Sequence, residues 1–397
     1  MARAAAVRLA ALVAATALLL AGCAESDNAG NGGGNNAGAG GNGPIKIGAI
    51  LDITGAGASL GVPERKTLEL LAKQTNDKGG VNGRKIDLII EDNQSTEDGA
   101  AKAMSKLVGR DKVDIVLGAS RTGPSLAMQP TAEQQKIPMI SLAANKKIVD
   151  GKQWVFKTAQ NDVVVLENMI TYAESKGWKT IGLARDASGF GEGVKEMLDE
   201  RGGSRGIKVV TVEKFAPDAT DFTAQMVKLR NAKADFNIIW GIPPAAALAQ
   251  KAYRQLGLTA PVMQSHGIGN KVFLDTAGAS ADGLIAPLGR LVVAGQLPED
   301  DPQKKVITEF VAAYQAAYNE RPSTFAGHAY DAYQLAIDAL TKVGTDKQKI
   351  RDHIEGVKDF VGVSGVFSMT PQDHSGLTKE ALVLTTVKGG QFQLLEG

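Results

Sequence analysis

Hydrophobic positions in the first half of the chain alternate between short, continuous apolar runs and longer stretches with helical spacing. Continuous runs predict strands that are covered on both faces, as in a parallel sheet, at 45–51, 86–90, 113–117 and 138–140. Apolar residues that recur every three to four positions predict intervening helices at 62–77, 96–108 and 124–135. The pattern therefore indicates a doubly wound α/β domain.

The same alternation restarts after residue 162. We expect strands at 180–184, 209–212, 236–239 and 262–263, and helices at 163–176, 190–201, 222–231 and 243–256. Helices at 302–318, 324–343 and 347–356 follow, and a hairpin at 382–387 and 392–395 closes the pattern. Such late elements add to domains that began earlier, so the chain is expected to cross between domains more than once.

The expected fold is therefore α/β, with two similar doubly wound parallel-sheet domains joined by a multi-strand hinge. We assign 44–162 plus 290–364 to the first domain and 163–289 plus 365–397 to the second. Ligands of open α/β sheets bind beyond the carboxyl ends of the strands, which places a cleft between the domains. The expected cleft loops are 54–61, 120–124, 142–145, 187–191, 242–244 and 265–269, and helix N-termini among them favour an anion.

The N-terminal residues carry a pattern typical of export. Arg3 and Arg8 precede an apolar run at 9–20, which is too short to span a bilayer. The run ends in small residues before Cys23, the only cysteine of the chain, and this is the form of a lipobox. We expect a lipoprotein signal peptide at 1–22, a lipidated Cys23 and a flexible Gly/Asn-rich tether at 23–43. The alternative is an ordinary cleaved signal peptide.

Composition narrows the classes of function. The chain has 397 residues, 44% hydrophobic and 22% charged, with a formal net charge of +1. There is no basic excess for a nucleic acid partner. Four scattered His and one Cys have no metal-ligand spacing, so we expect neither a metal nor another cofactor.

An enzyme is the first rival interpretation. Glycines at 55–61 follow a strand, Glu91 and Asp92 end the next, and Tyr172 and Lys176 have the Tyr-x-x-x-Lys spacing of some nicotinamide-dependent oxidoreductases. The glycine spacing is not that of the dinucleotide fingerprint, however, and no nucleophile elbow is present in the sequence. We therefore expect no enzymatic activity.

Several short motifs, in order along the chain, support a more specific interpretation. They are Ile47-Gly48-Ala49, Asn76-Asp77-Lys78-Gly79-Gly80, Glu91-Asp92-Asn93, Ile137-Pro138-Met139-Ile140-Ser141, Phe190-Gly191-Glu192-Gly193 and Tyr330-Asp331-Ala332. Over about 45–395 the chain resembles the leucine/isoleucine/valine-binding protein family, the type I periplasmic solute-binding receptors of ABC importers. The resemblance implies an extracytoplasmic, monomeric receptor that closes on a small carboxylate or amino acid and delivers it to permease subunits. A ligand-sensing receptor of the same fold is the alternative.

The resemblance also implies a ligand site. Members of the family hold the ligand carboxylate with a hydroxyl and backbone N–H groups, and the matching positions are Thr122 and the turn Ala143-Ala144-Asn145. Phe190 matches an aromatic residue that covers the ligand. Leu60, Ser120 and Arg121 lie in the neighbouring loops. Arg121 is expected either to bind an anion or to face solvent at the cleft rim.

Two positions depart from the family pattern. His266 stands where amino-acid binders place an acidic residue for the ligand ammonium, and Ile242 replaces a second aromatic residue. A neutral imidazole is a weak partner for an ammonium group. Our hypothesis is a carboxylate without an α-amino group, such as an aromatic acid or 2-oxo acid, with an amino acid as the alternative. His328, near the presumed inter-domain region, is expected on a helix surface, with a ligand contact as the alternative, and His353 and His374 are expected on the surface.

Overall fold

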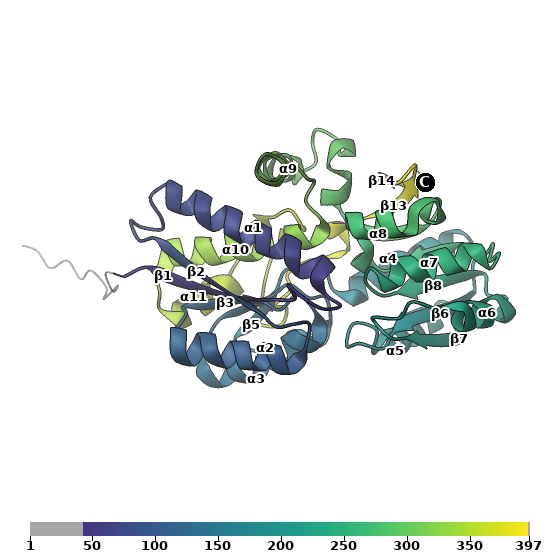
Figure 1. Cartoon of the computed structure of the whole chain (residues 1–397), viewed down its shortest axis with the longest axis horizontal. Helices are drawn as coiled ribbons and strands as arrows, with labels where there is room; N and C mark the ends of the chain where they lie inside the picture. Colours follow the sequence, from purple (N-terminus) through teal and green to yellow (C-terminus); the bar gives the residue numbers. More distant parts are fainter. Residues whose placement is uncertain (1–42, 396–397) are drawn as a thin grey trace, which may run out of the picture. The chain divides into compact units, whose positions relative to one another are not determined.

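The computed structural model describes residues 43–395. The predicted signal peptide, Cys23 and all but the last residue of the predicted tether lie outside the described residues. Within them the chain forms two large sheets and a small two-stranded one (Figure 1). No helix among residues 43–395 combines the length and the apolar character that crossing a membrane requires.

The first large sheet is entirely parallel, with strand order β2-β1-β3-β4-β5. Its strands are β1 (Ile45–Leu51), β2 (Ile86–Asp92), β3 (Ile115–Gly118), β4 (Met139–Ser141) and β5 (Val155–Lys157). One face is covered by α1 (Ala58–Asp77) and α10 (Thr324–Val343), the other by α2 (Glu97–Lys106) and α3 (Thr122–Gln135) (Figure 1). Covering both faces explains the continuous apolar runs of these strands.

The second large sheet repeats this arrangement. Strands β7-β6-β8-β9-β10 have the same relative order, and an antiparallel hairpin continues the sheet beyond β10. Its strands are β6 (Thr180–Asp186), β7 (Lys208–Phe215), β8 (Phe236–Trp240), β9 (Val262–Gln264), β10 (Ile285–Gly289), β13 (Leu382–Lys388) and β14 (Gln391–Leu394). The predicted fold of two similar doubly wound domains is confirmed.

Helices cover both faces of the second sheet as well. They are α4 (Asp162–Ser175), α5 (Val194–Gly203), α6 (Thr223–Ala232), α7 (Ala245–Gln255) and α8 (Lys271–Ala277). The remaining elements are α9 (Lys304–Tyr318), α11 (Lys347–Glu355), which packs on α10, and the small sheet of β11 (Phe360–Val361) and β12 (Val366–Phe367).

Most predicted elements are present, with shifted ends. The predicted helix at 190–201 is wrong at its start, because Gly193 takes a left-handed conformation (φ 82°) and α5 begins only after it. Phe190 is therefore a loop residue. Strands β5 and β10 and helix α8 were not predicted. Lys157 in β5 and Pro287 in β10 interrupt apolar runs that are already short.

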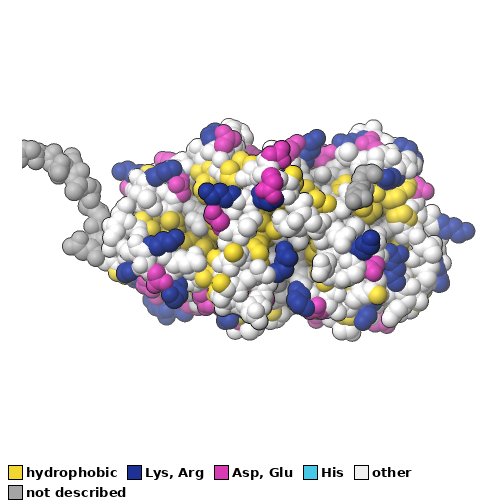
Figure 2. Space-filling view, turned by 90° about the horizontal axis from the view of Figure 1, so that it is seen from above, with side chains coloured by type: hydrophobic (Ala, Val, Ile, Leu, Met, Phe, Trp, Pro, Cys, Tyr) yellow, Lys and Arg dark blue, Asp and Glu magenta, His cyan; other side chains and the backbone are white. Residues whose placement is uncertain are grey.

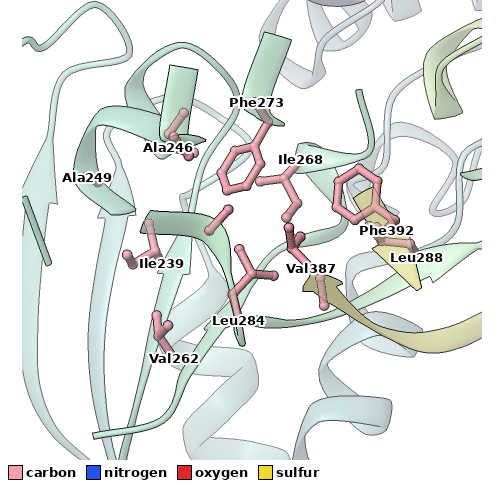
Figure 3. Packing of buried hydrophobic residues seen from close by; sticks show 14 of the residues in the cluster. Ile239, Ala246, Ala249, Val262, Ile268, Phe273, Leu284, Leu288, Val387 and Phe392 are labelled. Carbon is pink, nitrogen blue, oxygen red and sulfur yellow. The ribbon is translucent and has the colours of Figure 1, made fainter. Parts of the chain in front are cut away.

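Buried hydrophobic side chains form one cluster for each face of each large sheet. The clusters on the first sheet use α1 and α10 on one side and α2 and α3 on the other. Those on the second use α4 and α5 on one side and α6, α7 and α8 on the other. Figure 3 shows part of the last cluster, where Phe273, Ile268 and Leu284 meet Val387 of the hairpin. On the surface, both signs of charge are interspersed on the face seen in Figure 2.

The chain passes between the two large sheets after β5, again after β10, and a third time before β13. These passages are bonded to one another. The amide of Gln160 donates to the backbone oxygen of Ser364 at 2.7 Å, and the Asn161 amide donates to the Ser375 hydroxyl at 3.1 Å. Such a bundle of crossings is a hinge between two lobes, one built on each sheet. The exact domain boundaries stay a prediction.

Candidate functional site

A pocket of about 420 Å³ lies where loops of both lobes meet. The loops follow β3, β4, β6, β8 and β9, so the pocket is at the carboxyl ends of both parallel sheets, as the fold predicts. Its lining residues are Leu60, Ser120, Arg121, Thr122, Leu142, Ala143, Ala144, Ala159, Ser188, Phe190, Ile242, His266, Gly267, Phe325 and His328. The structure thus brings together every predicted ligand residue except Asn145.

The first lobe contributes hydrogen-bond donors. Thr122 is the first residue of α3, and no side chain caps the N-terminus of this helix. An uncapped helix start presents backbone N–H groups and the positive end of the helix dipole, which together favour an anion. Ala143 and Ala144 face the same pocket from the turn after β4. Leu60 of α1 adds an apolar wall.

The second lobe contributes an aromatic wall. The Phe190 ring lies 5.6 Å from the His266 ring in an edge-on arrangement, and 5.3 Å from the ring of Trp240. The indole N–H of Trp240 donates to the backbone oxygen of Phe190 at 3.1 Å and so fixes the loop that carries it. Trp240 is fully buried beneath the pocket lining. Ile242 and Gly267 complete this side.

His266 is buried and uncharged. Burial, assisted by the nearby Lys157 ammonium, lowers the pKa of His266 to about 3. Its Nε2 lies 3.9 Å from Oδ1 of Asp162, and its Nδ1 has no hydrogen-bond partner among the described residues. The ring therefore offers the pocket a polar group and no positive charge.

Lys157 and Asp162 lie behind the pocket. Lys157 is fully buried, and its Nζ donates to the backbone oxygens of Ala144 at 2.8 Å and Ala159 at 2.6 Å. Burial lowers the pKa of Lys157 and raises that of Asp162, and attraction between the two groups offsets part of each shift. Lys157 thereby holds the turn that carries Ala144 in place.

Arg121 and Ser120 belong to a buried network. The Arg121 guanidinium pairs with Asp52 through Nε and donates to the backbone oxygen of Ser95. The Ser120 hydroxyl donates to Glu64, and burial raises the pKa of Glu64 well above its ordinary value. Arg121 is thus neither solvent-facing nor a free cation, since Asp52 compensates much of its charge.

Asn145 lies beside the pocket and connects the lobes. Its Oδ1 accepts from the backbone N–H of Lys147 at 2.9 Å, and its Nδ2 donates to the backbone oxygen of Gly189 at 3.3 Å. Ser59 of the first lobe also donates to the backbone oxygen of Pro243 in the second at 3.0 Å. These contacts hold the lobes together over the pocket.

Gly189 of the second lobe lies close to Thr122 of the first. A Cβ atom at Gly189 would lie 3.3 Å from Cγ2 of Thr122, while its backbone has ordinary φ. We expect Gly189→Val to leave folding intact. It should weaken ligand binding by at least about 10-fold, because overpacking between the lobes opposes their closure. The ligand for this test is the carboxylate that stabilises the protein most. Gly203→Val is the matched control, since nothing lies within 4 Å of a Cβ there. Isothermal titration calorimetry of both variants tests this; equal affinities would contradict it.

Helix α10 supplies two lining residues that the sequence did not reveal, Phe325 and His328. The prediction that His328 lies on the surface is wrong: it is buried, and its Nδ1 is 3.0 Å from the Ser364 hydroxyl. His374 is also buried, stacked on Phe156. The bounds of α10 and the position of His328 near the inter-domain region were predicted, but the sequence did not show that His328 is buried and lines the pocket.

The rival chemistries find no support in this geometry. Tyr172 and Lys176 stack on each other at the end of α4 and do not line the pocket. Residues 43–395 contain no group of three or more His, Cys, Asp or Glu that could hold a metal ion.

Comparisons with known proteins agree with this architecture. The sequence model of a family described as periplasmic binding protein matches residues 44–391. A Leucine-, isoleucine-, valine-, threonine-, and alanine-binding protein of Pseudomonas aeruginosa is 27% identical over 317 residues, covering 78% of this chain and 81% of that protein.

Solved structures are similar over nearly the whole described chain. An extracellular ligand-binding receptor from Rhodopseudomonas palustris HaA2 superposes with a TM-score of 0.84 and 30% identity, covering 89% of this chain and 99% of that one. The branched-chain amino acid transporter substrate binding protein LivJ from Streptococcus pneumoniae, in complex with isoleucine, has a TM-score of 0.77, 27% identity and coverages of 88% and 98%. This chain therefore belongs to the periplasmic binding protein family, whose members include the Leu/Ile/Val-binding proteins of ABC transporters.

Proposed function

We propose that this protein captures a small carboxylate that lacks an α-ammonium group and delivers it to the permease of an ABC importer. One observation carries the proposal. The pocket lining, which lies wholly within the described residues, offers hydrogen-bond donors at the start of α3 but includes no Asp or Glu. Asp162 is buried behind His266 and does not line the pocket.

An α-amino acid fits this lining poorly. Besides apolar side chains, its ammonium would meet hydroxyl groups, Arg121 and two histidines whose pKa values burial holds at about 3, but no carboxylate. Burying an ammonium without an anionic partner costs several kcal/mol. Because some relatives are named for branched-chain amino acids, amino acids are the competing class of ligand. The apolar lining suits the apolar part of a ligand from either class.

Matched ligand pairs test the proposal. 4-Methyl-2-oxopentanoate is expected to raise the melting temperature by mass action, by about 2.7 kcal/mol of stability at a concentration of 100 Kd, and leucine to leave it unchanged. Phenylpyruvate and phenylalanine form a second pair. His266→Glu, which supplies a carboxylate, is expected to gain leucine binding. Tight binding of leucine by the wild type, with His266→Glu making no difference, would refute the proposal.

The location of the receptor is the second part of the proposal. The family is periplasmic, and we place the folded lobes at the outer face of a membrane, anchored by a lipid on Cys23 through the tether at 23–43. Metabolic labelling with an alkyne fatty acid is expected to mark the wild type and to leave Cys23→Ser unmarked. Equal labelling of both would show that Cys23 is not the anchor.

A further inference from the structure

A second pocket of about 1290 Å³, open to solvent, lies outside the ligand site and shares no lining residue with the first pocket. Its lining comes from 269–274 and 390–392 in the second lobe, from 319–323 between α9 and α10, and from 291–296 after β10. Helices α8 and α9 and the β13–β14 hairpin gather on the same side of the molecule (Figure 1). The volume is sufficient for an organic molecule of ordinary size.

The second pocket is made of parts that are attached to both lobes. The loop at 319–323 is bonded to α1 of the first lobe, because Glu320 accepts from Nζ of Lys66 at 2.7 Å and the Tyr318 hydroxyl donates to the backbone oxygen of Lys66 at 2.6 Å. Helix α8 and strand β14 belong to the second lobe, and residues 291–296 follow one of the hinge crossings. A molecule in this pocket therefore contacts both lobes, and its binding depends on the angle between them.

The two pockets also share a wall. Residues 266–267 line the first pocket, and 269–270 line the second. Across from them, residues at the start of α10 line both pockets in the same way. The backbone N–H of Thr324 donates to the backbone oxygen of Gly269 at 2.9 Å, and a Cβ atom at Gly269 would lie 2.1 Å from Oγ1 of Thr324. Because these segments are in direct contact, a shift of the wall on one side is transmitted to the other.

The lining of the second pocket combines apolar side chains with a positive charge. Leu274, Val292 and Phe392 supply apolar surface. Arg321 is exposed at the rim and forms no ion pair with any other residue of 43–395. A guanidinium in this position suits a carboxylate or sulfonate group, with which it forms charge-assisted hydrogen bonds.

The other two charged residues of this lining are compensated within the described chain. Nζ of Lys271 bonds to Asp275, at 2.5 Å and 2.6 Å from its two carboxylate oxygens, and Glu320 is paired with Lys66. The charge that the pocket offers to a ligand is therefore that of Arg321, so the lining favours an anion with an apolar body.

We propose that the second pocket binds a free organic acid with an apolar body, and that this acid and the ligand of the first pocket strengthen each other's binding. Ser59 and Asn145 hold the lobes together over the first pocket in the arrangement that forms the second one. An occupant that contacts both lobes stabilises this arrangement, which is the one that encloses the first ligand. Such coupling is reciprocal. The site itself is independent of the proposed function, whereas the coupling rests on it.

Isothermal titration calorimetry of the intact protein with decanoate tests the site. Decyltrimethylammonium is the control compound, because it carries the same alkyl chain with the opposite charge, and both are used below their micelle-forming concentrations. Decanoate is expected to bind more tightly. Arg321→Gln is expected to weaken decanoate binding about 3-fold, the effect of one exposed ion pair. Arg230→Gln is the matched control, because Arg230 is exposed on α6, forms no ion pair within the described chain and lines neither pocket.

A second variant locates the decanoate. Gly295 lines the second pocket with ordinary φ, and a Cβ atom there meets nothing within 4 Å. Gly295→Phe is expected to occupy part of the pocket and to weaken decanoate binding by at least about 10-fold, whereas Gly203→Phe leaves it unchanged. If Gly295→Phe binds decanoate like the wild type, or if the two alkyl compounds bind the wild type equally, the site is overturned.

The coupling is measured with 4-methyl-2-oxopentanoate as the ligand of the first pocket. Saturating decanoate is expected to raise its affinity by at least about 5-fold in the wild type and to leave it unchanged in Gly295→Phe. An affinity that decanoate does not raise in the wild type overturns the coupling. If 4-methyl-2-oxopentanoate fails to bind at all, the proposed function is overturned, and the decanoate titrations still decide whether the second site exists.

Discussion

Lys157→Met is expected to lower the free energy of unfolding by about 3–5 kcal/mol, because it removes the charged donor of two buried hydrogen bonds and a cation that attracts the buried Asp162. Methionine matches the length of the side chain but leaves the backbone oxygens of Ala144 and Ala159 without their donor. It also leaves Asp162 buried without its cation. Urea unfolding of the wild type and the variant measures the loss.

Two further variants show whether the loss of stability comes from the buried position of Lys157 and from its effect on Asp162. Lys147→Met, in an exposed turn between β4 and β5, is expected to change stability by less than about 0.5 kcal/mol. Lys157→Met/Asp162→Asn is expected to recover at least about 1 kcal/mol, because the second change removes the unpaired carboxylate. If Lys157→Met proves no more harmful than Lys147→Met, Lys157 does not stabilise the fold.

The second large effect is a loss of folding stability at acid pH, which we expect from the buried side chain of His328. Burial, with contributions from His266 and Lys157, lowers the pKa of His328 from 6.5 to about 3. The unfolded chain therefore binds a proton that the folded chain excludes, and stability that is complete above pH 6.5 is lost as the pH falls toward 3. The slope is about 1.4 kcal/mol per pH unit.

His328→Asn isolates this contribution. The Asn amide retains a polar atom near the position of Nδ1, which contacts the Ser364 hydroxyl, and it does not titrate. Unfolding free energies of wild type and variant should differ by a constant amount at neutral pH, and the wild type should lose about 2–3 kcal/mol relative to the variant over two pH units below 6.5. Buried carboxylates with raised pKa values stabilise the folded state as the pH falls, which opposes the effect of His328. Because both proteins contain them, their contribution cancels when one curve of unfolding free energy against pH is subtracted from the other. Parallel curves down to about pH 4.5, two units below the ordinary histidine pKa, would contradict the assignment.

The fold and most of the pocket were predictable from local patterns. Continuous apolar runs identified parallel strands, and the rule that ligands bind at strand carboxyl ends placed Thr122, Phe190 and His266 around one cavity. The family resemblance supplied their roles as proposals. The structure adds that the backbone of Phe190 is held by a hydrogen bond from Trp240, which in the sequence is only the last residue of a strand.

The polar layer behind the pocket was not predictable. Lys157 looks like the charged end of a three-residue strand, and Asp162 looks like an acidic residue in the first turn of a helix. Their proximity to His266 and His328 arises only when the hinge segments come together from distant parts of the chain. Local periodicity carries no information on such contacts, so His328 was expected at the surface and proved to be buried.

The order of synthesis gives α10 a further importance. This helix covers one face of the first sheet, yet it leaves the ribosome only after all the parallel strands of the second sheet. Until then only α1 covers this face of the nascent first lobe, which cannot complete its core. Because the first lobe is completed only by a helix from the last third of the chain, the chain stays unfolded for longer during synthesis. A secretion channel requires an unfolded chain.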